Sequence, residues 1–438
     1  MAISLEEQEL LVRTGPGTPM GEVFRRYWMP AFVAERLPEA DCPPIAIKLL
    51  GERLVAFRDS SGNVGILDEA CPHRGASLAL GRCEEGGLRC IYHGWKVDTA
   101  GNLLEAPPER NQELFAGKVK QTSYPTHEAG GLVWVYMGPR AAQPEFPHWR
   151  FCDLPESHVM AVHYRQETNW LQALEGDIDA PHASYLHLSM KAYRERHSVE
   201  DKFAAFFGFH READGHVQHL PWGVDTVWRY GMEDPERHDQ IREDVEAFLV
   251  HPYIAPASSI VAGGEALGIP YIWHGWTPID DEHHLVYYVH YDMDKPLTLE
   301  MREEISADFG HYRIDPDDEY RSTATMRNGH FQDRVKQRDE TYSGIDGIAA
   351  QDIAVVQSQG PILDRTKEHL GVEDVGVTAV RKFLLRAIKA VQRGEPAPRA
   401  LAPEHYAELD GYVGVVPVGT DWHGLVRNST AERDSVSV

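Results

Sequence analysis

The amino-acid sequence predicts an α+β protein of two domains: an all-β domain over residues 41–150 and a larger domain over residues 151–438 that combines an antiparallel sheet with helices. The chain has 438 residues, more than one hydrophobic core usually serves. From about 45 to 140 the pattern is one of short strands with turn signals, and after 155 strand and helix patterns alternate. Residues 1–40 are expected to be a lead-in helix and loop.

Charge and cysteine content narrow the function classes. The chain has 68 acidic and 43 basic residues, a formal net charge of −25, which disfavours nucleic acid as a partner because such binding needs clustered Lys and Arg. The start, MAISLEEQEL, lacks the basic and apolar regions of a signal peptide, and no apolar run has the length of a membrane span. The odd count of five cysteines disfavours a secreted disulfide scaffold. We therefore expect a cytoplasmic protein without a membrane partner.

The elements of the first domain follow from turns and apolar runs. LEEQELLVR, residues 5–13, predicts a short amphipathic helix. Residues 45–70 predict three short strands, separated by turn signals at 51–52 and 61–63. The apolar run GLVWVYMG predicts the last strand of the domain. Two prolines in RAAQPEFPHWRF, residues 140–151, place the boundary just after it.

The second domain begins with HVMAVHYRQETNW, which predicts a strand that ends at a helix start. The helix continues through LQALEGDIDAPHASYLH and is interrupted at Pro181. Further strands are predicted in DTVWRYGM, EAFLVHPYIAP, IPYIWHGWTPI and HHLVYYVHYDM, as parts of one antiparallel sheet. Residues 298–308 and 362–393 are expected to be helical.

A first cluster of potential ligands lies in CPHRGASLALGRCEEGGLRCIYHGW, residues 71–95. Cys71 and His73 stand in one segment, and Cys90 and His93 in another, so two loop tips each present one thiol and one imidazole. This set suits an iron–sulfur centre whose two irons have different ligands, Cys on one and His on the other. Zinc is the alternative, but zinc fingers pair Cys with Cys and His with His.

The remaining thiols do not fit the pattern. Cys83 lies between the two pairs, and Cys42 and Cys152 lie outside them. We interpret all three as incidental thiols.

A second cluster lies in the interrupted helix. His182 and His187 are five residues apart, and Asp179 precedes the first of them by three. Two histidines and one carboxylate form the facial triad of a mononuclear Fe(II) site, which leaves coordination positions for O2 and water.

Together these motifs resemble those of the Rieske non-heme iron ring-hydroxylating oxygenases. C-P-H-R-G and C-x-Y-H-G-W match the Rieske motif, and D-x-x-H-x-x-x-x-H matches the catalytic motif. Motif order, length, GTPMGEVFRRYWMPA and SGIDGIAAQDIAVVQSQGPILDRTKEHLG are similar to the phthalate dioxygenase branch. The resemblance implies an N-terminal Rieske [2Fe–2S] domain and a C-terminal catalytic domain of helix-grip (START-like) fold.

The resemblance also implies roles for individual residues. Cys71, His73, Cys90 and His93 would bind the [2Fe–2S] cluster. His182 and His187 would bind the mononuclear Fe(2+), with a third ligand far downstream. IDGIAAQDIAVVQSQGPI offers Asp352 for this role; Asp346 and Asp364 are rivals that suit turns or caps better.

Asp179 would carry electrons between subunits. It would hydrogen-bond a histidine ligand of the iron and a Rieske histidine of the neighbouring subunit. The branch consists of α-only homotrimers, sometimes stacked as hexamers, supplied by a flavin and ferredoxin-type reductase that draws on NAD(P)H. O2 is the co-substrate.

Two carboxylates near Asp179 complicate this interpretation. Many family members carry Asn where this chain has Glu175, and a buried Glu beside Asp179 is expected to raise the proton affinity of one of the two. Asp177 competes for the bridging role, but only Asp179 has the family spacing.

The expected substrate is an aromatic carboxylic acid of the phthalate, benzoate or lignin-derived type, which is either dihydroxylated or O-demethylated. A carboxylate needs a basic anchor, for which Arg211, Arg229 and His251 are candidates. Trp222, Trp228 and Phe248 are candidates to stack on a ring, although aromatic residues on strands more often belong to a core. Two alternatives remain: a Rieske electron carrier without oxygenase chemistry, and an inactive scaffold that binds both metals.

Overall fold

The computed structural model of the chain describes residues 3–190, 213–233, 241–263, 270–399 and 402–426, which form two compact units. The smaller unit comprises Arg13–Phe146 with Thr277–Asp281; the larger comprises Met1–Val12, Pro147–Trp276 and Glu282–Val438. The N-terminal segment thus groups with the larger unit, although the β-rich unit follows it in sequence. The domain boundaries near 40 and 150 stay predictions.

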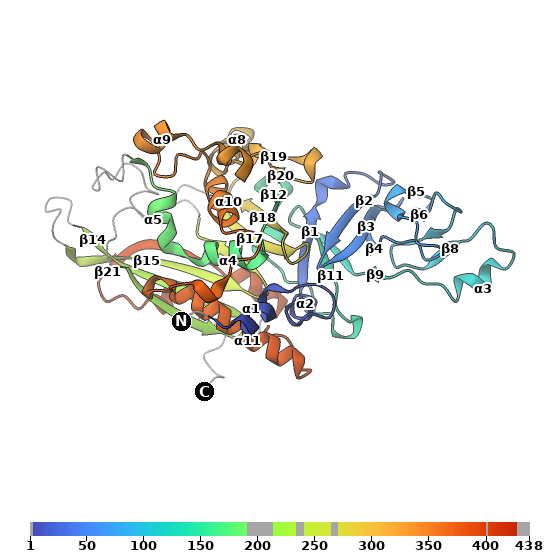
Figure 1. The fold of residues 1–438 in the computed structure, drawn as a ribbon, viewed down its shortest axis with the longest axis horizontal. Helices are drawn as coiled ribbons and strands as arrows, with labels where there is room; N and C mark the ends of the chain where they lie inside the picture. Colours follow the sequence, from blue (N-terminus) through green and yellow to red (C-terminus); the bar gives the residue numbers. More distant parts are fainter. Residues whose placement is uncertain (1–2, 191–212, 234–240, 264–269, 400–401, 427–438) are drawn as a thin grey trace. The chain divides into compact units, whose positions relative to one another are not determined.

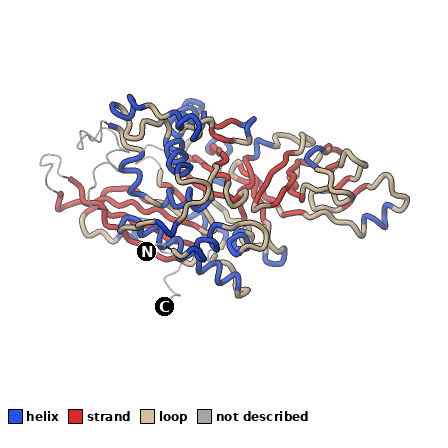
Figure 2. The backbone as a smooth tube through the Cα atoms, in the orientation of Figure 1, coloured by secondary structure: helices blue, strands red, loops and turns tan. Residues whose placement is uncertain are grey.

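Three small antiparallel sheets build the smaller unit, which is drawn mostly as strand and loop in Figure 2. Their strand orders are β1-β11-β10, β2-β3-β4-β9 and β5-β6-β7-β8. The three strands predicted over residues 45–70 are confirmed as β2, β3 and β4, and the strand that closes the domain is β11. The bounds are β1 Trp28–Val33, β2 Ile45–Leu49, β3 Glu52–Arg58, β4 Val64–Asp68, β5 Arg82–Glu84, β6 Gly87–Arg89, β7 Lys96–Val97, β8 Leu103–Glu105, β9 Ser123–Tyr124, β10 Thr126–Ala129 and β11 Leu132–Tyr136.

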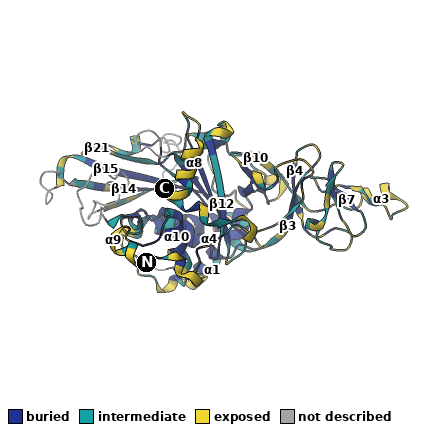
Figure 3. Cartoon of the chain, turned by 90° about the horizontal axis from the view of Figure 1, so that it is seen from above, coloured by how far each residue is buried: buried dark blue, intermediate teal, exposed yellow. Residues whose placement is uncertain are grey.

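Two short helices belong to this unit. The first, α2 (Pro19–Phe24), begins after Thr18, whose side chain accepts a hydrogen bond from the Gly21 amide at 3.3 Å. The second, α3 (Gln112–Ala116), buries no side chain and is drawn as exposed in Figure 3. The core of the unit therefore rests on its sheets rather than on helices.

One long sheet organises the larger unit. Its strand order is β13-β14-β15-β16-β17-β18-β12-β20-β19, with β21 paired to β15. The pairs are antiparallel except for β12 with β20, so the predicted antiparallel sheet has one parallel pair. The bounds are β12 Val159–Gln166, β13 Ala213–Leu220, β14 Gly223–Glu233, β15 Ile241–Ile254, β16 Ser258–Val261, β17 Tyr271–Pro278, β18 His284–Tyr291, β19 Ile314–Asp315, β20 Arg321–Ser322 and β21 Tyr412–Pro417.

Helices pack on this sheet (Figure 1). Helix α4 contacts β15 and β16, α11 contacts β13 and β14, and α10 contacts both α4 and α8. The helix predicted over residues 298–308 is confirmed as α8. The bounds are α1 Leu5–Val12, α4 Trp170–Ile178, α5 Ala183–Leu186, α8 Leu299–Phe309, α9 Arg334–Asp339, α10 Ile348–Ser358 and α11 Val375–Gln392.

The helix predicted over residues 362–393 is wrong in its first third, because α11 begins only at Val375. Two single 3-10 turns, Arg365–Lys367 and Val372–Asp374, precede it. The Asp364 side chain caps the first turn by accepting a hydrogen bond from the Thr366 amide, and such local bonds compete with a continuous helix.

Candidate active site

Two matched loops carry the first ligand set. The Cys71 amide donates to the Ala76 carbonyl at 2.8 Å, and the Gly75 amide donates back to the Cys71 carbonyl at 2.9 Å. The second loop repeats this pattern: the Cys90 amide donates to Trp95 at 2.8 Å and the Gly94 amide donates to Cys90 at 3.0 Å. Gly75 and Gly94 have φ values of 72° and 75°, a region that favours glycine. The two loops therefore present their cysteines in the same way.

The donor atoms of the loops lie in two layers. Cys71 and Cys90 are 4% and 2% exposed within the core of the unit, whereas His73 and His93 are half-buried at its edge, with ring centroids 4.6 Å apart. Burial raises the pKa of the Cys71 thiol to about 11, and the neighbouring Cys90 adds to this effect. Two buried thiols side by side, with two imidazoles outside them, fit a cluster that takes sulfur ligands on one iron and nitrogen ligands on the other.

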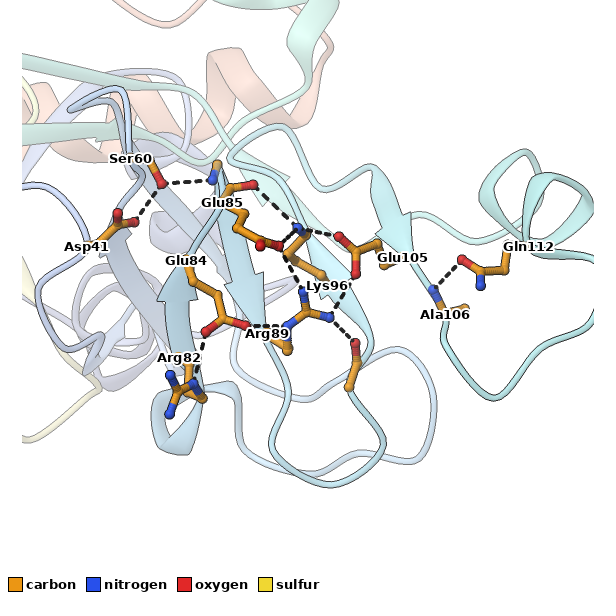
Figure 4. Close-up of polar contacts among 12 residues, drawn as sticks. Asp41, Ser60, Arg82, Glu84, Glu85, Arg89, Lys96, Glu105, Ala106 and Gln112 are labelled. Atoms are coloured by element: carbon orange, nitrogen blue, oxygen red, sulfur yellow. Dashed lines mark hydrogen bonds and ion pairs between the residues drawn. The ribbon is translucent and has the colours of Figure 1, made fainter.

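Ion pairs and hydrogen bonds of two cations, Arg89 and Lys96, support the second loop (Figure 4). Arg89, next to Cys90, donates to the Gly94 carbonyl at 3.0 Å and to Glu84 and Glu105 at 2.5 and 2.9 Å. Lys96, which follows Trp95, also pairs with Glu105 and is 4% exposed at its side chain. These bonds join all four strands of the β5-β6-β7-β8 sheet at the base of the loop.

The second ligand set comes from two helices far apart in sequence. Helix α4 ends at Ile178, and a 3-10 turn, Ala180–His182, follows because Pro181 cannot continue the α-helical hydrogen bonds. His187 ends the next helix, α5, and Asp352 lies on α10.

The three side chains meet at one point. The Nε2 atoms of His182 and His187 are 3.1 Å apart, and Asp352 Oδ1 lies 3.7 and 3.3 Å from them. Two nitrogens bound to one ion at about 2.1 Å and at right angles are about 3 Å apart, so the spacing fits a shared ion. Among the residues that the structure describes, this is the one group of three His, Cys, Asp or Glu side chains close enough to hold a metal ion.

Hydrogen bonds orient both imidazoles. His187 donates its Nδ1–H to Gln351 Oε1 at 2.7 Å, and the Gln351 amide in turn donates to the Ile345 carbonyl at 2.7 Å. His182 Nδ1 contacts the Asp179 carbonyl. With the Nδ1 protons directed at oxygen atoms, both Nε2 atoms remain available as ligands. The rivals of Asp352 lie elsewhere: Asp346 pairs with Lys336 at 2.7 Å, and Asp364 caps a 3-10 turn.

Asp179 and Asp177 have different surroundings. Burial raises the pKa of Asp179 to about 6; His182 acts against this shift, and Asp374 and Glu373 add to it. Asp177 is bound by two imidazoles, His274 at 2.5 Å and His251 at 3.2 Å. Its carboxylate is thus already engaged inside the larger unit, unlike that of Asp179.

The expectation for Glu175 is wrong. Glu175 accepts from Arg365 Nη2 at 2.8 Å and from Arg381 Nε at 2.6 Å, and Arg365 is fully buried. Burial alone would raise the pKa of Glu175, but the two guanidinium groups outweigh it and lower that pKa. The raised pKa of Asp179 has other causes, so the two carboxylates do not share a proton.

A cavity of about 310 Å³ opens beside the three clustered side chains, a size in the range of small-molecule sites. Part of its wall is formed by apolar side chains of β15, β16, β18 and α10. Its polar lining includes Asp177, Asp179, His182, His187, His251, His274, Tyr288, Asp352, Glu368, Asp374 and Arg381.

The predicted substrate residues divide into three groups. His251 lines the cavity, whereas Arg229 does not and pairs instead with Glu246 at 3.1 Å. Arg211 lies outside the described residues. Trp222, Trp228 and Phe248 are each 2% exposed, as core residues are, and do not line the cavity.

Sequence reasoning missed His274. The residue stands on β17 in IWHGW, where its alternation with Trp276 on the same face was the available signal. Both residues line the cavity.

Comparison with known proteins agrees with these two centres. A family model described as the Rieske [2Fe-2S] domain matches residues 27–125, and one described as LigXa C-terminal domain like matches residues 135–437. The fold resembles the crystal structure of dicamba monooxygenase bound to dicamba, with a TM-score of 0.55 over 85% of this chain and 99% of that one at 16% identity. The chain belongs to the Rieske oxygenase α-subunit family, and it is the oxygenase subunit of an aromatic-ring dioxygenase or O-demethylase.

Two relatives define the branch. The 3-chlorobenzoate-3,4-dioxygenase oxygenase subunit of Comamonas testosteroni is 34% identical over 98% of this chain and 100% of its own length. The phthalate 4,5-dioxygenase oxygenase subunit of Pseudomonas putida is 35% identical over 95% and 93%. This chain is a member of that branch. It contains a Rieske cluster, family membership implies a mononuclear iron, and an oxygenase subunit implies a reductase partner. None of the described helices is long and apolar enough to cross a membrane.

Proposed function

We propose that the protein uses O2 and reductase-delivered electrons to oxidise an aromatic carboxylic acid, by dihydroxylation or by O-demethylation. The observation that carries the proposal is the convergence of His182, His187 and Asp352 beside a cavity large enough for one substituted ring. Two relatives are named for 3-chlorobenzoate and phthalate, both aromatic carboxylates.

The residues divide the work between two metal centres. Cys71, His73, Cys90 and His93 hold the [2Fe–2S] cluster, and the triad in the larger unit holds Fe(2+). The cluster supplies single electrons, and the iron binds and activates O2. The chain's own part is to keep both ligand sets oriented, to hold the ring beside the iron and to exclude water with the apolar cavity wall.

Asp179 is the electron bridge of the proposal. Its carbonyl contacts a ligand imidazole, and the residue lines the cavity. In a homotrimer, or in a hexamer made of two such rings, this carboxyl group meets a Rieske histidine of the neighbouring subunit. In a closed ring of head-to-tail contacts, every subunit makes this same contact with its neighbour.

The reductase is a flavin and ferredoxin-type protein that takes its electrons from NAD(P)H. It reduces the cluster. Reconstitution of this protein with candidate reductases would identify which one supports turnover.

The test is oxygen uptake by the reconstituted protein against a panel of aromatic acids. Uptake coupled to loss of the acid supports the proposal. Trapped formaldehyde indicates O-demethylation, whereas a diol product indicates dihydroxylation. A protein that oxidises neutral aromatic compounds and none of the acids would contradict the substrate class.

Iron content separates this function from that of a pure electron carrier. About three irons per chain are expected for the oxygenase and about two for a pure electron carrier. An inactive scaffold would also bind about three, and only turnover excludes it.

A further inference from the structure

One carboxylate in the cavity wall binds two imidazoles. Asp177, on α4, lies with Oδ1 at 2.5 Å from His274 Nδ1 of β17 and with Oδ2 at 3.2 Å from His251 Nε2 of β15. Both histidines are 7% exposed, and all three residues line the cavity. Burial would raise the pKa of Asp177, but His251 and His274 lower it well below its usual range, so the carboxylate is ionised.

A buried ionised carboxylate needs a cation beside it. The contact of 2.5 Å with His274 is the shorter of the two, as expected for a charge-assisted bond. His274 Nδ1–H therefore donates to Asp177.

The second ring nitrogen of His274, Nε2, is not used in the contact with Asp177. This Nε2 is buried and has no hydrogen-bond partner among the described residues. Buried polar atoms usually have a partner, so this nitrogen in the cavity wall is a position at which a ligand group can bind. When both ring nitrogens carry hydrogen, this atom is a donor and suits an anionic acceptor.

No other cation competes for that acceptor among the described lining residues. Arg381 is the one guanidinium there, and it is already paired with Glu175 and Glu368, at 2.6 Å in each case. The remaining charged lining groups outside the imidazoles are carboxylates, including Asp179, Asp352 and Asp374.

The groups that face His274 from neighbouring elements are neutral. The Tyr288 ring, on β18, lies 4.2 Å from it, and burial raises the pKa of that phenol. Burial also lowers the pKa of His290 and that of His311, the latter to about 3. None of these neighbours therefore competes with His274 for an anionic ligand.

We propose that His274 donates its Nε2–H to the carboxylate of the aromatic acid substrate, with Asp177 as the positioning residue and His251 as a second imidazole beside it. The inference rests on the proposed function and specifies its substrate recognition. In the proposed complex the His274 ring lies between two carboxylates, Asp177 and the substrate, and its two N–H groups bind one each. The carboxylate end of the ring is then held at β15 and β17.

The experiment compares 3-chlorobenzoate with its neutral analogue 3-chlorobenzamide. Dissociation constants of both are measured by calorimetry on the iron-loaded protein, for the wild type and for His274→Phe, His274→Gln and Asp177→Asn. His163→Phe is the matched control, because His163 is a buried imidazole of the same sheet, on β12, that does not line the cavity.

His274→Phe is expected to weaken acid binding about 10- to 100-fold, as for loss of a hydrogen bond to a charged group, and to change amide binding less than about twofold. His274→Gln, which keeps a donor but not the charge, should lose less. Asp177→Asn should lower the affinity for the acid relative to the affinity for the amide, without loss of iron. A residue with a merely structural role would weaken the binding of both compounds alike. The control should keep the wild-type ratio.

An equal loss of affinity for the acid and the amide in both His274 variants would overturn the inference. It would also be overturned if Arg211→Gln lost affinity for the acid while the His274 variants kept it. If the wild type binds and oxidises aromatic acids while the His274 variants retain the wild-type ratio, this inference alone fails. If the wild type binds neutral aromatic compounds and no acid, the proposed substrate class fails with it.

Discussion

The Nε2 atoms of His182 and His187 lie 3.1 Å apart, and Asp352, from a helix more than 160 residues further along the chain, lies 3.3 Å from the second of them. The Nδ1 atoms of both imidazoles face oxygen acceptors, so the three ligand atoms point at one position. Placing two imidazoles and a carboxylate this close is costly unless an ion joins them.

Replacement of His182 by Ala should abolish turnover and leave the Rieske cluster in place. The iron content should fall from about three to about two per chain, because only the mononuclear site loses a ligand. Iron analysis, the visible spectrum of the cluster and oxygen uptake check this outcome. Retained turnover would remove His182 from the ligand set.

Asp179→Asn should slow reduction of the mononuclear centre by the cluster while both metals remain bound. The amide keeps the size of the carboxyl group but cannot take up a proton or carry a charge between two imidazoles. Single-turnover rates of cluster oxidation measure the step. The Asp364→Asn variant is the control, since Asp364 caps a 3-10 turn and does not line the cavity. Equal rates in Asp179→Asn and the wild type would refute the bridge.

Cys71→Ser should remove the [2Fe–2S] cluster, whereas Cys83→Ser should keep it. Cys71 lies beside Cys90 in the core of the unit. Burial raises the pKa of Cys83 to about 12, and Cys42 and Asp41 add to this effect. The electron paramagnetic resonance signal of the reduced cluster reports the difference. Loss of the signal in the Cys83 variant would contradict the assignment of the ligands.

Glu175→Gln should lower stability by about 3–5 kcal/mol, because two buried guanidinium groups lose their shared carboxylate. The folded-state pKa of Glu175 lies below its ordinary value of 4.5, so its contribution is present above that pH and is lost as the pH falls toward the lower folded-state pKa. Denaturant unfolding at pH 7 and at pH 4 should therefore show a smaller difference for the variant than for the wild type. An unchanged pH dependence would show that Glu175 is not the responsible group.

The local motifs of this protein could be predicted from the sequence because their geometry is local. Each cluster loop closes on itself through hydrogen bonds between residues four and five apart, so Cys71–His73 and Cys90–His93 are recognisable in the sequence alone. The same holds for Asp179, His182 and His187, which Pro181 places on consecutive turns. Strand and turn patterns likewise predicted β2 to β4 and, in the long sheet, β12, β14, β15, β17 and β18.

Two other features depended on contacts distant in sequence. From the sequence, Glu175 was expected to raise the proton affinity of a neighbouring carboxylate. The packing of α4 against α11 and the turn before it places Arg381 and Arg365 in hydrogen-bonding contact with the Glu175 carboxylate. Asp352 had rivals that the fold placed on Lys336 and on a turn cap.

The sequence by itself determined the two metal-binding motifs and the class of enzyme, since short spacings in loops and helix ends specify which side chains share a turn. Only the tertiary structure decided which distant groups balance buried charges. Asp177, His251 and His274 lie on three different elements, and the register of the long sheet and its packing on α4, rather than any spacing along the chain, bring them together.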